Sequence, residues 1–180
     1  MTDRSAFTAA QVHDNGGPLV QVRLGPSGLP AAARAAGRIA APPERVWATI
    51  TDVESYARHV PMMTRVRQQG ERVTVDLGFK VALFSVGFHF VAELRRDDAG
   101  RTLALHGISG EPRDLRLSFV VEPFDGDPSA TLLHTGGEFD PLSVGWLAKY
   151  FLKHHPEIQV GMFPGVALSL LGAMKKAAES

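Results

Sequence analysis

The chain has 180 residues, of which 44% are hydrophobic and 21% charged, a size and composition suited to one globular domain with a sizeable core. Nineteen Lys and Arg residues balance nineteen Asp and Glu residues, so the formal net charge is zero. This balance lacks the basic excess that binds a polyanion, and we expect no nucleic acid partner. The absence of cysteine excludes disulfides, thiolate nucleophiles and cysteine metal sites.

The amino-terminal segment is polar and acidic where a secretory signal would be basic and then apolar. We therefore expect a cytoplasmic protein. The breaker cluster NGGP stands at residues 15–18. It predicts a flexible segment at residues 1–18, followed by a single ligand-binding domain at residues 19–180.

Two strands are expected next. Residues 19–24 predict the first strand. The alanine-rich run that follows has helical propensity, but Gly37 and the double proline after Ala41 weaken a helix. Its place in the wider pattern favours a strand from Arg34 to Ala41, with a helix as the alternative.

Two short helices are predicted after the double proline. Pro43 suits a first helical position, and Thr51 followed by Glu54 matches the capping-box pattern, so a second helix is expected to begin at Thr51 and to end at Pro61. Their apolar faces consist of Val46, Trp47 and Ile50 in the first helix and of Val53, Tyr56 and Val60 in the second.

A meander of strands and a helical C-terminal part follow. The strand patterns are Thr64 to Gln69, Arg72 to Val81, Ser85 to Arg95, Thr102 to Gly107, Asp114 to Glu122 and Ala130 to Asp140. Residues 143–156 predict one helical segment. A second carries apolar residues at i, i+4 spacing from Ile158 to Met174, and Pro164 is expected to kink it or to delay its start. Its apolar stretch is too short to span a bilayer.

This order predicts an α+β domain in which a bent antiparallel sheet wraps a long C-terminal helix. The stretch VWATITDVESYARHVPMM, preceded by APPERV, resembles the START-related SRPBCC superfamily, in particular its polyketide cyclase/dehydrase and coenzyme Q-binding branch. The matching positions are Trp47, Ile50, Asp52, Tyr56, Val60 and Pro61. The resemblance implies a helix-grip (START-like) fold with a deep ligand cavity, which lipid carriers, quinone binders and ring cyclases share.

Side chains alternate between the two faces of a strand, and the apolar set should face the helix. The ligand-binding wall predicted in this way consists of Val75, Leu77, Phe79, Phe88, Phe90, Leu103, Leu105, Leu117, Phe119 and Leu133, with Met62, Phe163, Val166 and Leu170 from outside the strands. The same alternation points His89, His106 and Arg116 outward. The inner wall is therefore predicted to hold almost no group for proton transfer.

The last strand leaves the orientation of His134 open, because both of its faces contain a leucine. We favour a surface histidine; an inward His134 beside Glu138 would be a candidate acid/base or a hydrogen-bonding partner for a ligand head group. No carboxylate or cysteine spacing accompanies His89, His106 and His134, so we predict no metal and no cofactor.

The hairpin VALFSV at residues 81–86 lacks the usual turn residues and offers Leu83 and Phe84 at its tip. An apolar tip favours a lid, a protein partner or transient membrane contact. The alternative is that the tip folds back onto its own domain.

We expect a non-catalytic binder or carrier of a small hydrophobic molecule, such as a lipid, a sterol, an isoprenoid quinone or a polyketide-like compound. The first alternative is a polyketide aromatase/cyclase that uses His134 and an inward Arg38 or Arg116. The second alternative is a protein-interaction module that binds through residues 81–86 and has no internal ligand.

Overall fold

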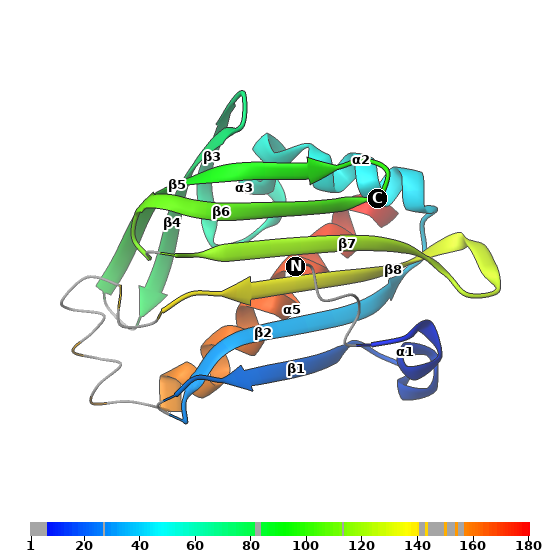
Figure 1. The fold of residues 1–180 in the computed structure, drawn as a ribbon, viewed down its shortest axis with the longest axis horizontal. Helices are drawn as coiled ribbons and strands as arrows, with labels where there is room; N and C mark the ends of the chain where they lie inside the picture. The colour runs from blue at the N-terminus through cyan, green and yellow to red at the C-terminus, as the bar shows by residue number, and fades with distance from the viewer. Residues whose placement is uncertain are drawn as a thin grey trace.

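In a computed structural model of the chain, an eight-stranded antiparallel sheet covers one side of a long helix, α5 (Glu157–Glu179) (Figure 1). The described residues are 7–26, 28–81, 84–112, 114–140, 143, 150, 154 and 157–180, and only the backbone is described at 79–81, 84–86 and 157–159. The α+β class predicted from the order of elements is confirmed.

The strands follow the order β1-β2-β8-β7-β6-β5-β4-β3 across the sheet, and every neighbouring pair is antiparallel. Their bounds are β1 Leu19–Leu24, β2 Pro30–Ile39, β3 Met63–Gln69, β4 Arg72–Val81, β5 Phe84–Asp97, β6 Thr102–Gly110, β7 Arg116–Phe124 and β8 Asp127–Glu138. The predicted meander is thus confirmed. The alanine-rich run is a strand, although it begins at Pro30 instead of Arg34 and ends at Ile39.

Short helices join β2 to β3. They are α2 (Pro43–Thr51), the 3-10 turn η1 (Val53–Ser55) and α3 (Tyr56–His59). The predicted capping box at Thr51 is wrong: Thr51 is the last residue of α2, and its hydroxyl donates back to the Trp47 carbonyl at 3.0 Å. The chain turns at Asp52, which makes no side-chain cap hydrogen bond.

The segment before β1 contains a helix that the sequence analysis does not predict, α1 (Ala9–Asn15). Thr8 and Gln11 form a reciprocal capping box at its start. Ala9 and Val12 are buried against the sheet, where Ala36 belongs to the same small apolar cluster. Helix α1 therefore covers part of the sheet face opposite α5.

Helix α5 lies close to the centre of the sheet because two strand positions are glycine. A Cβ at Gly37 would stand 3.0 Å from Leu171, and one at Gly137 would stand 3.3 Å from Val166. The helix begins at Glu157 and includes Pro164, so the predicted late start is wrong. The helix predicted at 143–156 lies outside the described residues, apart from three positions.

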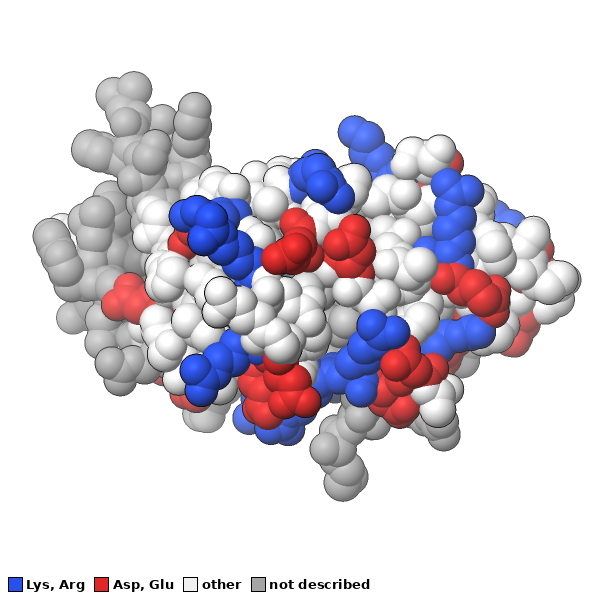
Figure 2. Space-filling view, turned by 90° about the horizontal axis from the view of Figure 1, so that it is seen from above, with Lys and Arg blue, Asp and Glu red and all other residues white. Residues whose placement is uncertain are grey.

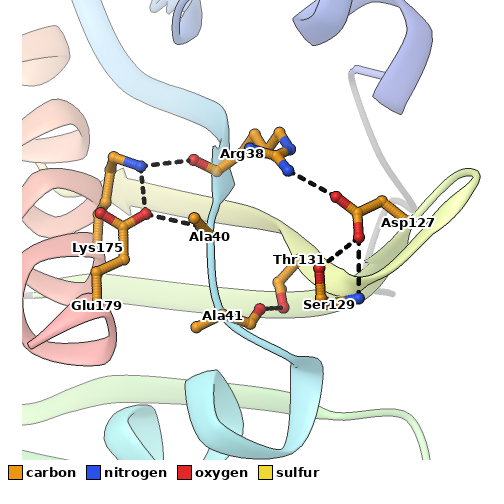
Figure 3. Close-up of polar contacts among 8 residues, drawn as sticks. All are labelled: Arg38, Ala40, Ala41, Asp127, Ser129, Thr131, Lys175 and Glu179. Carbon is orange, nitrogen blue, oxygen red and sulfur yellow. Dashed lines mark hydrogen bonds and ion pairs between the residues drawn. The ribbon is translucent and has the colours of Figure 1, made fainter.

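A polar contact network fastens the C-terminal end of α5 to β2 (Figure 3). Lys175 Nζ donates to the Arg38 carbonyl at 3.1 Å and pairs with Glu179, which accepts from the Ala40 amide at 2.7 Å. On the other side of the strand, Arg38 binds Asp127, the first residue of β8, at 2.6 Å. The contacts of Lys175 and Glu179 join the C-terminal end of α5 to the end of β2.

The surface seen in Figure 2 carries basic and acidic side chains interspersed, in keeping with the zero net charge. Within the part of the chain that is described, no helix is long and apolar enough to cross a membrane. Leu83 and the Phe84 side chain, predicted to touch a membrane or a partner, lie outside the described residues.

Candidate functional site: the apolar interior beneath helix α5

The interior between the sheet and α5 is built from the strand face that alternation predicts. The predicted wall residues with no more than 3% exposure are Val75, Phe90, Leu103, Leu105, Leu117, Phe119, Leu133, Phe163 and Leu170. Four others are partly buried: Met62, Leu77, Phe88 and Val166. The side chain of Phe79 lies outside the described residues. Alternation thus places the inner face correctly, and whether these side chains contact a ligand stays a prediction.

The partly buried members lie at one end of the interior. Leu77 pairs with Phe88 across β4 and β5, and the neighbouring Gly78 amide donates to the Met62 carbonyl at 2.9 Å. On α5, Met162 and Val166 are partly buried, in contrast to Leu170 and Met174 further along the helix.

Figure 1 shows this end at the left, where α5 begins and β8 ends. Phe139, just after β8, stacks on Phe163 with ring centroids 4.7 Å apart and is itself partly buried. Inward-facing apolar side chains that keep solvent contact mark the end at which a ligand could reach the interior. We call this set, Met62, Leu77, Phe88, Met162 and Val166, the open end.

The opposite end is closed by α2, which contacts α5, β7 and β8. Val46 and Ile50 are fully buried there. Trp47 packs against the core as predicted, and its indole N–H donates to Asp98 at 3.0 Å. The first of the two short helices, α2, therefore closes this end of the sheet.

Buried polar side chains of the described residues use their hydroxyls on backbone carbonyls. Thr135 donates to Ala167 of α5 at 2.8 Å, Thr131 to Ala41 at 2.7 Å and Ser55 to Asp52 at 2.7 Å. Each bond satisfies a group that would otherwise be costly to bury. These hydroxyls hold the fold together and are not directed at a ligand.

Tyr56 is the one titratable residue among the described residues with buried side chains. Its hydroxyl donates to the Ile50 carbonyl at 2.6 Å, and its ring meets Phe119 edge-on at 5.9 Å. Burial, with a smaller contribution from the nearby Asp52 carboxylate, raises the pKa of Tyr56 far above its usual range. The phenol therefore stays neutral, and it acts as a packed core residue that braces α2 against the sheet.

His134 lies on the outer face of the sheet, opposite α5, aligned with Ala36 and Val120. The outward orientation agrees with the favoured prediction, but the side chain is only 11% exposed and is not a surface group. Its Nε2 is buried, without a hydrogen bond among the described residues, and lies 3.5 Å from a Glu122 oxygen. Burial lowers the pKa of His134, and Glu122 only partly offsets this.

The two faces of β8 both carry a leucine because each is covered by a helix. Leu133 points to α5, while Leu132 is buried in the cluster formed with α1. This is why the alternation of apolar residues in β8 did not decide which way His134 points.

The other residues considered for catalysis also face outward. Arg38 binds Asp127 and lies over the Phe124 ring, 5.5 Å from its centroid, and Arg116 is exposed. Neither reaches the interior that the cyclase alternative requires. His89 pairs with Asp76 at 2.6 Å, also on the outer face. Among the residues that the structure describes, no three His, Asp or Glu side chains are grouped to hold a metal.

The sequence matches one family over most of its length. The model for polyketide cyclase/dehydrase and lipid transport proteins matches residues 31–160, and the chain belongs to this family. No curated protein matches the chain. Membership implies hydrophobic ligand binding or polyketide cyclase activity, and it agrees with the superfamily indicated by residues 41–63.

Solved structures of low sequence identity share the fold. A Thermus thermophilus protein, TTHA0849, gives a TM-score of 0.62 at 18% identity over 81% of this chain and 94% of that chain. The Zhui aromatase/cyclase from Streptomyces sp. R1128 gives 0.61 at 20% identity, over 82% and 93%. A START superfamily protein from Mycobacterium smegmatis gives 0.51 at 16% identity, over 78% and 99%. The predicted helix-grip fold is confirmed.

Proposed function

We propose that this protein binds a small hydrophobic molecule, such as a lipid, sterol, isoprenoid quinone or polyketide-like compound, between the sheet and α5, and transports or sequesters it. The observation that carries the proposal is the change in burial along the interior. Val46 and Ile50 on α2 are fully buried, whereas Met62, Leu77, Phe88, Met162 and Val166 keep solvent contact at the open end.

Apolar contact would supply the affinity. Each Å² of apolar surface removed from water contributes about 25 cal/mol, so about 200 Å² of ligand carbon contributes about 5 kcal/mol before the costs of association. Met62 and Met162 suit this role, because flexible thioethers adapt to ligands of different shape.

The aromatase/cyclase alternative has less support from the described residues. Proton transfer needs a titratable side chain within hydrogen-bond reach of the substrate. Tyr56 already donates to the Ile50 carbonyl, and His134, Arg38 and Arg116 lie on the other face. We therefore favour binding without chemistry. A cytoplasmic location belongs to the same proposal, and docking through residues 81–86 remains a separate prediction.

The direct test is native mass spectrometry of the purified protein, followed by organic extraction of whatever co-purifies. We expect one hydrophobic molecule per chain, or uptake of an added short-chain isoprenoid quinone. Val166→Glu, which places a charge at the open end, should abolish uptake. Leu168→Glu is the matched control because this side chain lies on the same helix and is 37% exposed, so uptake should persist. A folded wild-type protein that binds nothing would contradict the proposal.

A further inference from the structure

Helix α5 carries one polar side chain in an otherwise apolar stretch. From Val160 to Met174 the sequence reads VGMFPGVALSLLGAM, and Ser169 is its only residue with a polar side chain. Serine is a weaker helix former than alanine, so helix propensity does not account for its presence at this position. What the Ser169 hydroxyl contacts therefore decides its role.

Ser169 lies on the flank of α5 that carries the helical residues of the open end. It stands three residues after Val166 and seven after Met162, so the three side chains share one stripe of the helix. All three are partly buried. Leu171, about 200° further around the helix, packs beside Gly37 of β2. Ser169 thus faces away from β2, on the same side as the open end.

Ser169 also lies deeper in the molecule than the other residues of this stripe. The seven residues from Met162 correspond to a rise of about 10 Å along the helix. Leu170 and Met174, which follow, are fully buried, and α2 contacts the helix where it closes the interior. Ser169 therefore stands at the boundary between the part of the interior that keeps solvent contact and the part that is packed.

The Ser169 hydroxyl makes no hydrogen bond to any residue in the described part of the chain. Hydroxyls in a helix can bond back to the carbonyl one turn earlier, and Thr49 and Thr51 of α2 do so, each at 3.0 Å. Thr135 and Tyr56 also donate to backbone carbonyls. Ser169 differs from these four residues because its donor and its acceptor are both unused.

An unused hydroxyl in apolar surroundings selects a ligand by its polar group. A serine hydroxyl supplies one donor and two acceptor sites, so it can pair with one carbonyl or hydroxyl oxygen. A buried oxygen without such a partner is costly, whereas a paired one is not. Arg38 and Arg116 lie on the outer face of the sheet, so neither can compensate a carboxylate at this position. The chemistry at Ser169 therefore favours a neutral polar group.

We propose that Ser169 is the polar contact of the ligand bound beneath α5. The ligand is a neutral hydrophobic molecule that places one carbonyl or hydroxyl oxygen beside Ser169, while its hydrocarbon lies along Val166 and Met162 toward the open end. This inference rests on the proposed function and adds to it a residue that determines specificity. It favours neutral isoprenoids, sterols and ketones over fatty acids.

The experiment compares three naphthalene probes that differ in one substituent. They are 2-acetylnaphthalene, a neutral ketone, 2-ethylnaphthalene, which lacks its oxygen, and 2-naphthoate, which is charged. Each probe is titrated into the full chain, and the Kd is taken from the saturable shift of the Val166 methyl NMR signals. In the wild type, the ketone should bind more tightly than the naphthoate.

The decisive variant is Ser169→Ala. It should raise the Kd of the ketone about three- to tenfold, the range expected for one hydrogen bond, and leave the Kd of 2-ethylnaphthalene unchanged. Its thermal midpoint should not fall below that of the wild type, because alanine is the stronger helix former. Ser180→Ala makes the same substitution at an exposed position just after α5, and it should leave all three Kd values unchanged.

The possible failures are distinguishable. If Ser169→Ala changes the Kd of the ketone and of 2-ethylnaphthalene equally, or changes neither, the assignment of Ser169 is overturned while the hydrophobic site stands. A naphthoate that binds as tightly as the ketone would overturn the preference for a neutral group. If no probe gives a saturable shift in the wild type, the proposed function fails, and the assignment of Ser169 fails with it.

Discussion

The two faces of the same sheet use neighbouring residues for opposite purposes. Phe119 is fully buried beneath α5, while Ser118, next to it in sequence, lines a hollow of about 690 Å³ on the outer face of the sheet, the outer hollow. The inner face offers hydrocarbon, and its buried hydroxyls are used internally. The outer face offers arginine and imidazole. Successive side chains of a strand point to opposite faces of the sheet, so the same strands carry an apolar interior on one face and a polar hollow on the other. A substitution on one face can therefore leave the other face unchanged.

The largest expected effect comes from truncating the inner face. Phe119→Ala should lower the free energy of unfolding by about 3–5 kcal/mol, because it leaves a cavity in a packed core. Val120→Ala, one residue along on the outer face, is the matched control and should cost about 1 kcal/mol. Urea denaturation measures both, and equal losses would break the distinction between the faces.

A second test follows the buried phenol. The chain has two tyrosines, so in a Tyr150→Phe variant Tyr56 is the only remaining phenol. Because burial raises the Tyr56 pKa, the folded variant should show no tyrosinate absorbance at 295 nm near pH 10. The unfolded chain ionises there, so stability should fall as pH rises above 10. An ordinary titration in folded protein would place Tyr56 in contact with water.

On the outer face, His134 should make stability depend on pH. Its folded pKa is lowered, so the unfolded chain takes up the proton more readily, and stability falls as pH drops below about 6.5. His134→Gln should make this fall shallower between about pH 7.5 and 5.5, as measured by urea denaturation at several pH values. An unchanged slope would mean that His134 is solvated.

The smallest effect is expected where α5 is fastened to β2. Lys175 is half-exposed, and its contacts with Glu179 and the Arg38 carbonyl should contribute less than about 1 kcal/mol. Lys175→Ala should therefore lower the thermal midpoint only slightly, with neighbouring Lys176→Ala as the control. A loss as large as that of Phe119→Ala would make the polar contact network, and not the apolar interior, the main support of the helix.

The inner face was predictable because clean alternation reports which side of a strand is buried. In β4 the apolar residues fall on one parity, and in β7 Leu117, Phe119 and Val121 share one parity although Val120 lies on the other; Val75 and Phe119 are buried as that pattern indicates. In β8 the same rule fails to decide, because Leu132 is covered by α1. The signal for α1 was present as the TAAQ capping box at residues 8–11.

The outer hollow could not be found by the same means. Ala104, Ser118 and Gly136 lie on three strands, and they become neighbours only through the pairing register. The capping-box prediction failed for a different, local reason: Thr51 ends α2, and its hydroxyl bonds to the Trp47 carbonyl four residues earlier instead of capping a new helix. The three aligned positions on the outer face depend on strand register, which a local sequence pattern does not report.

The central claim, a hydrophobic ligand held beneath α5, is tested most directly by methyl NMR of the full chain titrated with a short-chain isoprenoid quinone. The methyl groups of Leu77, Leu117 and Val166 report on the interior, and those of Ala104 and Val120 report on the outer face of the sheet. We predict saturable shifts for Leu77, Leu117 and Val166, with Ala104 and Val120 unchanged. Shifts confined to Ala104 and Val120, or no saturable shift at all, would contradict the account.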